Sequence, residues 1–554
     1  MPHRAHLMSL RLAHALRESL REPPYTAARL GKDCLAGMTV GLVSIPLAMA
    51  LAIASGASPD KGLVTAVIAG FLISFLGGSR VQVGGPTGAF VVVVFNVIAA
   101  HGYDGLLLAT LMAGVMLIIC GYARLGVVIK YVPYPVITGF TAGIAVIIAS
   151  SQVKDFLGLK IKDVPAEFIE KWLVYFEHMG TLDIFTLGVG LFALAIIIVI
   201  RKKAPKLPGY LIAVVAASVI VALFHLPVET IGSRFPHIPS GLPMPELPTF
   251  TFEKLKSVIP SAFTIAFLAG IEALLSAVVA DGMTGYKHRS NQELVGQGVA
   301  NVASALFGGL PATGAIARTA TNIRSGAKSP VAGMMHAVFL LIFMMAASDV
   351  MKYVPMAALA AILFIVAWGM SEIRHFIHIY KLSRTDRTVM ILTFLLTVLV
   401  DLTVAIGVGV TLACLIFMMQ MSKTVEIAAG KGNDEEDQRL SLPRDVEVFR
   451  INGPFFFGVS SELIDVLTRM GQMPRVLIVR MRLVPFLDTS GVSALEDMVK
   501  KCKAAGTIVI FAALQPQPRG LMNRLHFGEG VLYAGNYEEA LEKSREIVEI
   551  AAAD

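Results

Sequence analysis

The longest part of the sequence, residues 34–425, is a series of about fourteen apolar stretches separated by polar segments. Most of these stretches approach the roughly twenty residues that a helix needs to cross the hydrocarbon core of a bilayer. Because a backbone in lipid must satisfy its own hydrogen bonds, such stretches fold as transmembrane helices. The composition agrees, since 55% of the residues are hydrophobic and only 16% are charged. We therefore predict an α-helical polytopic membrane protein.

The predicted spans form two groups of seven with opposite orientations, which is the arrangement of an inverted repeat. The first group lies near residues 34–53, 62–77, 85–100, 104–123, 131–152, 182–200 and 208–224. The second group lies near residues 258–281, 294–307, 313–324, 330–349, 355–371, 388–403 and 404–422. Lys and Arg gather in the loops that this count places inside the cell, so the positive-inside rule places both termini in the cytoplasm.

The chain divides into four parts by composition. Residues 1–33 are basic and lack a signal-peptide pattern, so we expect a cytoplasmic N-terminal segment before the transmembrane domain of residues 34–425. Residues 426–441 are predicted to be a polar linker. Residues 442–554 have the mixed charge of a soluble region and are predicted to form a small cytoplasmic α/β domain of about four strands. The expected strands lie at residues 446–451, 476–479 and 507–511, and the expected helices lie near residues 459–470 and 491–504.

Charge and cysteine spacing exclude several classes of function. The net charge of +7 is explained by basic cytoplasmic loops beside the lipid bilayer, so we predict no nucleic-acid partner. The four cysteines, Cys34, Cys120, Cys414 and Cys502, are far apart and fit no metal-ligand or disulfide spacing. We therefore predict no metal and no other cofactor. The soluble tail contains no catalytic constellation, so we predict that the protein is not an enzyme.

Two apolar stretches, one in each half, end in the same short pattern. Residues 74–78 and 305–309 both consist of a small residue, two large apolar residues and Gly-Gly. Each is followed by a short extended segment, residues 84–87 or 311–314, before the next helix. Paired interruptions of this kind mark the central binding site of a secondary transporter. Because a helix that begins inside the membrane directs unpaired N–H groups and its positive dipole end into the site, we predict transport of a small anion.

The first interruption supplies groups that suit an anion site. Gly84 and Gly85 let backbone amides approach a ligand closely. Pro86 fits the first turn of a helix because it has no N–H group to leave unpaired. Thr87 adds a hydroxyl group. We predict that all four residues contribute to substrate binding.

The second interruption is followed by Arg318. A guanidinium group near the start of a helix adds a fixed positive charge and can hold a carboxylate or oxyanion through two hydrogen bonds. A salt bridge to Glu272 or Asp281, or snorkelling of the side chain to the membrane surface, is the alternative.

Glu272 lies within an apolar stretch and has no charged neighbour within one helical turn on either side. Ionisable residues at such a depth are costly and mark function by default, so we predict that Glu272 binds and releases a proton during transport. A structural carboxyl group that is hydrogen-bonded to a neighbouring span is the alternative. In the first span, Pro46 either directs a freed backbone carbonyl towards the cavity or kinks its helix without a role in binding.

One turn of the soluble tail also carries information. Asp488, Thr489 and Ser490 precede Gly491 at the expected start of a helix. This turn offers capping groups and a position that accepts an anion or a phosphate group, so a regulatory role is possible there. A plain helix cap is the favoured alternative.

Together these segments resemble the sulfate permease family, the bacterial relatives of the SLC26 anion exchangers. The resemblance covers nearly the whole chain. It is carried by the Ile-Pro-x-x-Met-Ala segment within residues 41–56, by Gly84-Gly85-Pro86-Thr87, by Ala317-Arg318-Thr319 and by Asp488-Thr489-Ser490-Gly491. The last segment resembles the phosphorylatable turn of STAS domains.

The resemblance implies core and gate domains, an elevator-like movement and a homodimer in the bacterial inner membrane, with a cytoplasmic STAS domain that regulates transport or binds a protein partner. It places the substrate between the third and tenth spans, at residues 85–87 and 315–318. Ala315, Ala317 and Thr319 therefore join Arg318 as predicted binding residues. The coupling carboxylate of the family maps to Glu272, where Glu instead of Asp favours protons over sodium.

The resemblance leaves several substrates open. Many sulfate-carrying members have Pro-Gln in the first span, where this chain has Pro46 and Leu47. Residues 45–53 and 280–285 are most similar to a branch that transports dicarboxylates, so C4-dicarboxylates rank level with or slightly above sulfate, and bicarbonate ranks third. An uncoupled anion exchanger or channel and a sodium-coupled bicarbonate transporter are the alternatives. Arg318 and the STAS-like tail argue against a nucleobase transporter of the same architecture.

Overall fold

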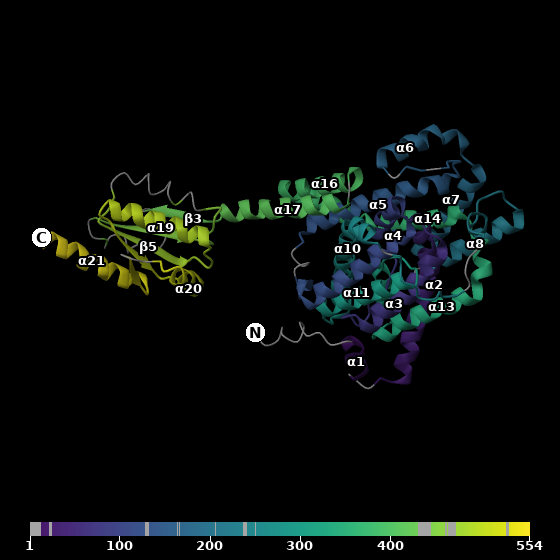
Figure 1. The fold of residues 1–554 in the computed structure, drawn as a ribbon, viewed down its shortest axis with the longest axis horizontal. Coiled ribbons are helices and arrows are strands. Elements are labelled where there is room, and N and C mark those ends of the chain that lie inside the picture. The colour runs from purple at the N-terminus through teal and green to yellow at the C-terminus, as the bar shows by residue number, and fades with distance from the viewer. Residues whose placement is uncertain are drawn as a thin grey trace. The chain divides into compact units, whose positions relative to one another are not determined.

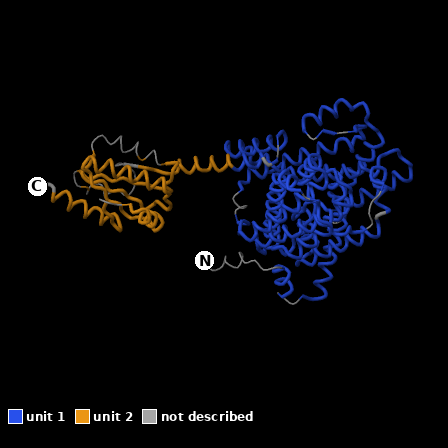
Figure 2. The backbone as a smooth tube through the Cα atoms, in the orientation of Figure 1, with its two compact units in different colours: residues 1–410 blue, residues 411–554 orange. Residues whose placement is uncertain are grey.

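The computed structural model describes residues 13–553 except residues 22–24, 128–131, 163, 166, 205–206, 237–240, 250, 401, 430–441, 443–444, 460–462, 464–472 and 528–530. The chain forms two compact units, Met1–Val410 and Thr411–Asp554, which Figure 2 colours blue and orange. Each unit has a hydrophobic core of its own.

Several helices of the first unit pack into a bundle around α11. They are α2 (Ala27–Ala54), α3 (Pro59–Leu76), α4 (Gly88–Tyr122), α10 (Phe252–Thr284), α11 (Ser290–Leu306), α12 (Ile316–Arg324) and α13 (Pro330–Met351). Helix α11 packs against α3, α4 and α10, and Figure 1 shows these helices near the middle of the unit. Helices α2, α3 and α13 pack against one another at the edge of this bundle. The bundle corresponds to the predicted core domain.

A second group of helices in the first unit packs around α5 (Tyr134–Leu157). The other long members are α7 (Ile184–Lys203), α8 (Gly209–Phe224), α14 (Met356–Met370) and α16 (Arg384–Leu399). Helix α5 contacts α7, α14 and α16, as expected of a gate domain. The short elements of this unit are α1 (His14–Arg21), β1 (Gly84–Gly85), α6 (Phe168–Glu177), η3 (Met179–Thr181), α9 (Ile231–Arg234), β2 (Thr313–Gly314) and α15 (Ile373–Leu382). Helix α17 (Leu402–Ser422) continues the chain into the second unit.

The helices account for the predicted spans. Within the described residues, 9 helical segments are long and apolar enough to cross a membrane. Four shorter helices, α8, α11, α12 and α16, occupy further predicted spans. Helix α4 covers two spans, because Gly102 breaks it with a non-helical φ of 71°. The predicted polytopic helical fold is therefore confirmed, and every predicted span has a helical segment.

The predicted boundary between the N-terminal segment and the first span falls inside α2, which begins at Ala27. Asp33, in the second turn of α2, is 0% exposed. Its carboxylate accepts hydrogen bonds from the Tyr25 hydroxyl at 2.6 Å, the Lys328 N–H at 2.9 Å and the Ser329 hydroxyl at 2.5 Å. Burial and the hydrogen bond to Asp33 raise the pKa of Tyr25 to about 12, so this hydroxyl remains a donor.

The second unit contains a five-stranded sheet. Its strands are β3 (Glu426–Ala429), β4 (Val446–Asn452), β5 (Val476–Leu483), β6 (Ile508–Ala512) and β7 (Leu532–Ala534), in that spatial order. Strand β3 pairs antiparallel with β4, and the remaining pairs are parallel. Its described helices are α19 (Thr489–Ala504), α20 (Pro516–Arg524) and α21 (Tyr537–Ala553). Alternate residues of the central strands belong to two apolar clusters, as expected for a sheet covered on both faces.

Three predicted strands and the helix near 491–504 match β4, β5, β6 and α19. The first residues of the predicted linker instead form β3, because their backbone pairs with β4. The rest of the linker, and almost all of the helix expected near 459–470, lie outside the described residues.

Candidate functional site

The two interruptions meet in a short antiparallel ribbon inside the first unit. Strand β1 pairs with β2, with Gly84 opposite Gly314 and Gly85 opposite Thr313. The Ala315 N–H donates to the Val83 carbonyl at 2.9 Å, which extends the ribbon by one hydrogen bond. Helix α4 begins three residues after β1, and α12 begins two residues after β2. The ribbon therefore brings the starts of two helices together, as the paired pattern predicts.

Glycine is required in this ribbon because neighbouring atoms occupy the space of a side chain. A Cβ atom on Gly84 would lie 2.2 Å from the Ile73 Cδ1, and one on Gly314 would lie 1.5 Å from the Gln82 Nε2. Gly85 has a φ of 149°, and its Cβ would lie 2.2 Å from the Arg318 Nη1. The glycines thus serve close packing of the ribbon as well as access to its backbone.

Thr87 and Glu272 face each other at the start of α4. The Thr87 hydroxyl donates a hydrogen bond of 2.7 Å to the Glu272 Oε2. Thr87 is the N-cap residue of α4, but its side chain makes no capping bond and is committed to the carboxyl group instead. Both residues are half-buried, and Ala317 in the first turn of α12 is exposed. This side of the ribbon is accordingly accessible, and it combines a hydroxyl group, an ionisable group and two helix starts.

Arg318 extends from the first turn of α12 into the interior of the bundle. Its side chain is 2% exposed, and none of its three nitrogen atoms has a hydrogen-bond partner among the described residues. Neither proposed acid pairs with it, since Glu272 accepts from Thr87 and Asp281 accepts from His288 at 2.8 Å. Snorkelling is excluded by the burial. A buried guanidinium without a counter-charge is costly to the folded state.

The remaining predicted binding residues have different surroundings. The Thr319 hydroxyl accepts from the Val83 N–H at 3.1 Å and from the Ser276 hydroxyl at 3.2 Å, so it holds the ribbon against α10. Pro86 is buried, and Ala315 contributes its backbone to the ribbon. Pro46 lies inside α2, which packs against α12 and not on the ribbon itself. The structure thus brings together the residues of both interruptions and Glu272, but places Pro46 outside this group.

A buried polar stripe on α11, which sequence reasoning missed, holds both interruptions. The Glu293 carboxylate accepts from the Gly78 N–H at 2.7 Å, from the Ser79 N–H at 3.1 Å and from the Gln297 side chain at 2.7 Å. Two turns further along, the Asn301 side chain exchanges two 2.8 Å hydrogen bonds with the backbone of Ala312. The spacing 293, 297 and 301 places these side chains on one helical face and could have revealed the stripe. We name Glu293, Gln297 and Asn301 the α11 stripe.

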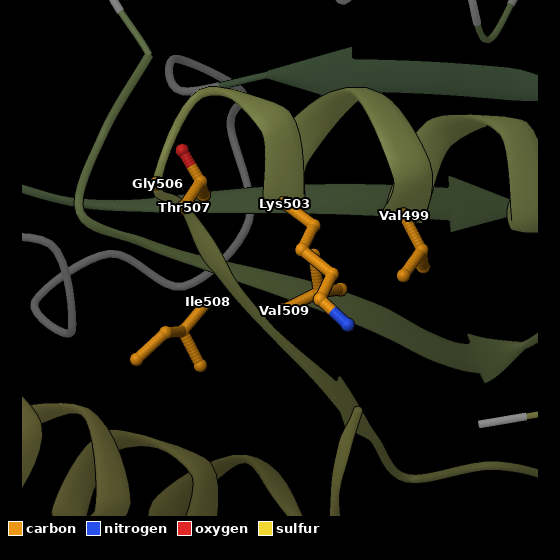
Figure 3. Close-up of a pocket in the computed structure, with 6 residues that line it drawn as sticks. All are labelled: Val499, Lys503, Gly506, Thr507, Ile508 and Val509. Atoms are coloured by element: carbon orange, nitrogen blue, oxygen red, sulfur yellow. The ribbon is translucent and has the colours of Figure 1, made fainter. Parts of the chain in front are cut away.

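In the turn of the second unit, both carboxylate oxygens of Asp488 are hydrogen-bonded. The Asp488 carboxylate accepts from the Gly491 N–H at 2.7 Å and from the Phe457 N–H at 3.1 Å, so it caps α19. Thr489 and Ser490 are exposed in the first turn of this helix. A pocket of about 240 Å³ lies at the other end of α19, where Figure 3 shows Lys503 and Val499 beside Thr507, Ile508 and Val509. Val499, the lining residue nearest in sequence to the turn, lies nine residues after Ser490, or roughly 14 Å along the helix, so the pocket does not include the turn.

Comparison with known proteins agrees with this architecture. Residues 30–393 match the Sulfate permease family, and residues 440–540 match the STAS domain. A Bacillus subtilis protein named "Putative sulfate transporter YvdB" is 42% identical over 513 residues, which are 92% of this chain and 96% of that protein. The bicarbonate transporter BicA of Picosynechococcus sp. is 32% identical over 511 residues, 88% of this chain and 89% of that protein.

Two solved structures are similar as well. The transmembrane domain of a cyanobacterial bicarbonate transporter BicA aligns with a TM-score of 0.63 at 33% identity, over 68% of this chain and 98% of that domain. The murine Solute Carrier 26 family member A9 anion transporter aligns with a TM-score of 0.84 at 18% identity, over 96% of this chain and 94% of that protein. The second likeness concerns the fold alone.

Proposed function

Because the chain belongs to the sulfate permease family, we propose that it is a proton-coupled secondary transporter of small anions with a homodimeric, elevator-like mechanism. The observation that carries this proposal is the hydrogen bond between Thr87 and Glu272 at the start of α4. This bond joins an ionisable group to the helix end that faces the anion, so a change in protonation of Glu272 alters the substrate site directly. Arg318 supplies the positive charge from the other side of the ribbon.

Sulfate and C4-dicarboxylates are the proposed substrates. Both carry two negative charges, which suit two helix N-termini and one guanidinium. The relative named as a sulfate transporter, at 42% identity, supports sulfate as the first candidate. Dicarboxylates rest on the resemblance of residues 45–53 and 280–285 alone.

Bicarbonate transport driven by sodium is the second candidate. It is supported by the 32% identity with a protein named as a bicarbonate transporter. Under this alternative, Glu272 belongs to a sodium site, and a sodium gradient drives uptake. An uncoupled exchanger would use the same ribbon without any role for Glu272 in accumulation.

The test is uptake into proteoliposomes that contain the full-length protein. Labelled sulfate, succinate and bicarbonate are compared under an inward proton gradient, an inward sodium gradient and no gradient. We expect accumulation of sulfate or succinate to require the proton gradient. Glu272→Gln should abolish this accumulation, whereas the exposed-site variant Glu177→Gln should not. Accumulation driven by sodium, or flux in Glu272→Gln that equals that of the unaltered protein, contradicts proton coupling.

The second unit is proposed to lie in the cytoplasm, together with both termini, and to regulate transport or bind a protein partner through the turn of Asp488, Thr489 and Ser490. The exposed hydroxyl groups of this turn support accessibility to a modifying enzyme or a partner. Truncation after residue 431 is expected to change uptake or its regulation. Unchanged uptake, assembly and regulation contradict this role.

A further inference from the structure

A second buried polar side chain without a partner lies close to Arg318. His336, on α13, is 0% exposed, and neither ring nitrogen has a hydrogen-bond partner among the described residues. The structure places it within electrostatic range of Arg318. A buried imidazole with no partner costs about 1–3 kcal/mol for each polar atom that is left unpaired. Because buried polar side chains are nearly always hydrogen-bonded, an unpartnered imidazole in this position requires an explanation.

The ring of His336 lies beside the ribbon. A Cβ atom on Gly70 of α3 would lie 3.8 Å from both the Cε1 and the Nδ1 of His336, and 3.1 Å from the Gly84 carbonyl oxygen. A single glycine of α3 thus separates the imidazole from β1. The same strand contacts Arg318 at Gly85. Arg318 therefore contacts β1 at Gly85, and His336 lies across Gly70 from the neighbouring residue Gly84.

Helix α2 adds a third unpartnered group on the same side. Gly37 and Gly41 face α13, since their Cβ atoms would lie 2.8 Å from the His336 N and 2.7 Å from the Phe339 Cδ1. Ser44 follows on the same helical face. It is 0% exposed, and its hydroxyl group has no partner among the described residues. Arg318, His336 and Ser44 are thus three buried polar side chains without hydrogen-bond partners among the described residues, and they belong to α12, α13 and to α2, which packs against both of those helices.

The charged groups on the helices packed against α13 do not neutralise His336. Helix α13 packs against α1, α2 and α3. On α1, Glu18 pairs with Arg80 at 3.1 Å. On α2, Asp33 is bonded to Ser329, two helical turns before His336. On α3, Asp60 and Lys61 lie nine or ten residues from Gly70, about 14 Å along the helix. Arg318 is consequently the charged residue that acts on His336.

We propose that His336 is a second recognition residue of the anion site, which takes up a proton when a divalent oxyanion binds beside Arg318. This inference rests on the proposed function. Without an anion, a protonated imidazole and a guanidinium repel each other, whereas a bound dianion offsets both charges. A monovalent anion offsets only the guanidinium, so the imidazole remains neutral and donates one N–H at most. His336 therefore sets the preference for divalent over monovalent anions, and acid strengthens that preference.

The test compares sulfate with nitrate in proteoliposomes of the full-length protein at pH 6 and pH 8. The ratio of the half-saturation concentrations is expected to shift by about tenfold in favour of sulfate at the lower pH, the change expected when one group titrates across this range. His336→Gln should remove the shift and retain uptake of nitrate. His375→Gln, at an exposed histidine on α15, should retain the shift. A His336→Gln variant with an undiminished shift overturns the inference.

A measurement on the unaltered protein keeps the test decisive if His336→Gln does not fold. Nitrogen chemical shifts of labelled histidine, recorded with no anion, with sulfate and with nitrate, report the protonation of each ring. One histidine is expected to become protonated with sulfate and to remain neutral with nitrate. The absence of any such histidine overturns the inference, while sulfate uptake in the same preparation leaves the proposed function standing. Absence of anion uptake of every kind is a failure of the proposed function.

Discussion

Two turns in this chain begin helices with small and hydroxyl residues, but their polar groups are in opposite conditions. At the membrane ribbon, Arg318 is buried and all three of its nitrogen atoms lack partners in the described structure. At the start of α19, Asp488 has both carboxylate oxygens hydrogen-bonded to backbone N–H groups. The first arrangement lowers the stability of the folded protein, and the second raises it. A buried charge without a partner thus distinguishes Arg318, whereas the Asp488 carboxylate belongs to a hydrogen-bonded helix cap.

The largest effect is expected from a change at Arg318, the buried group without partners. Arg318→Gln should reduce anion uptake by roughly a hundredfold, because removing one partner of a buried charged pair costs about 2–5 kcal/mol of binding. The melting temperature without anion should be unchanged or higher, because the variant no longer buries an uncompensated charge. Uptake in proteoliposomes and thermal unfolding in detergent measure the two effects. A variant that loses stability in the absence of anion would place Arg318 in the scaffold.

Glu293→Ala tests a buried carboxylate that is fully hydrogen-bonded within the membrane unit. It leaves the N–H groups of Gly78 and Ser79 buried without an acceptor, so the free energy of unfolding should fall by roughly 2–5 kcal/mol. The melting temperature in detergent checks this loss, and Glu177→Ala, at an exposed position, is the matched control. A Glu293→Ala protein with full stability and abolished uptake would assign Glu293 to the site instead.

Asn301→Ala sharpens the comparison between the two ends of the α11 stripe. The Asn301 amide pairs with both backbone groups of Ala312, but these hydrogen bonds involve no charge. The loss of stability should therefore be about 1–3 kcal/mol and smaller than that of Glu293→Ala. The same thermal unfolding experiment ranks the two variants. The reverse order would show that the second interruption depends on this helix more strongly than the first.

Asp488→Ala should produce a smaller effect that is confined to the second unit. Loss of an N-cap side chain costs about 1 kcal/mol, so hydrogen exchange of α19 peptides in the full-length protein should accelerate by about fivefold. Anion uptake without any regulatory partner should remain the same. Acceleration that extends to α4 or α12 would contradict the assignment of Asp488 to a local cap.

Thr489→Ala provides the lower limit of the series. Its side chain is exposed, so the change in stability should be within about 0.5 kcal/mol and the exchange of α19 should not change. A measurable acceleration would mean that the hydroxyl group contributes to the cap although its side chain is exposed.

Hydropathy was sufficient to predict the helical membrane fold, because apolar length and loop charge are local properties of the sequence. The comparisons confirm the family and the STAS domain that the sequence motifs indicated. Strand β3 was missed because the short run Glu426–Ala429 has weak β-propensity and gains its structure from pairing with β4.

The site was predictable where glycine patterns marked it and unpredictable where it depends on distant partners. The repeated Gly-Gly segments pointed to the meeting of the two helix starts. Glu293 lies one residue before the expected start of its span at residue 294, and its partners Gly78 and Ser79 are distant in the sequence. His336 lies in an apolar stretch, and no sequence signal connects it with Arg318. Helix packing alone determines the positions of these residues, and a single sequence does not specify helix packing.

The ribbon also dictates when the site can form during synthesis. Its strands pair Gly84 with Gly314, and 230 residues separate these partners. At about 5–20 residues per second, a ribosome needs roughly ten to fifty seconds to deliver the second strand after the first. Throughout that interval β1 has no partner strand, although lipid provides no hydrogen bonds for an open backbone. The first half of the chain must therefore wait in the membrane with an unpaired strand until the second half has been synthesised.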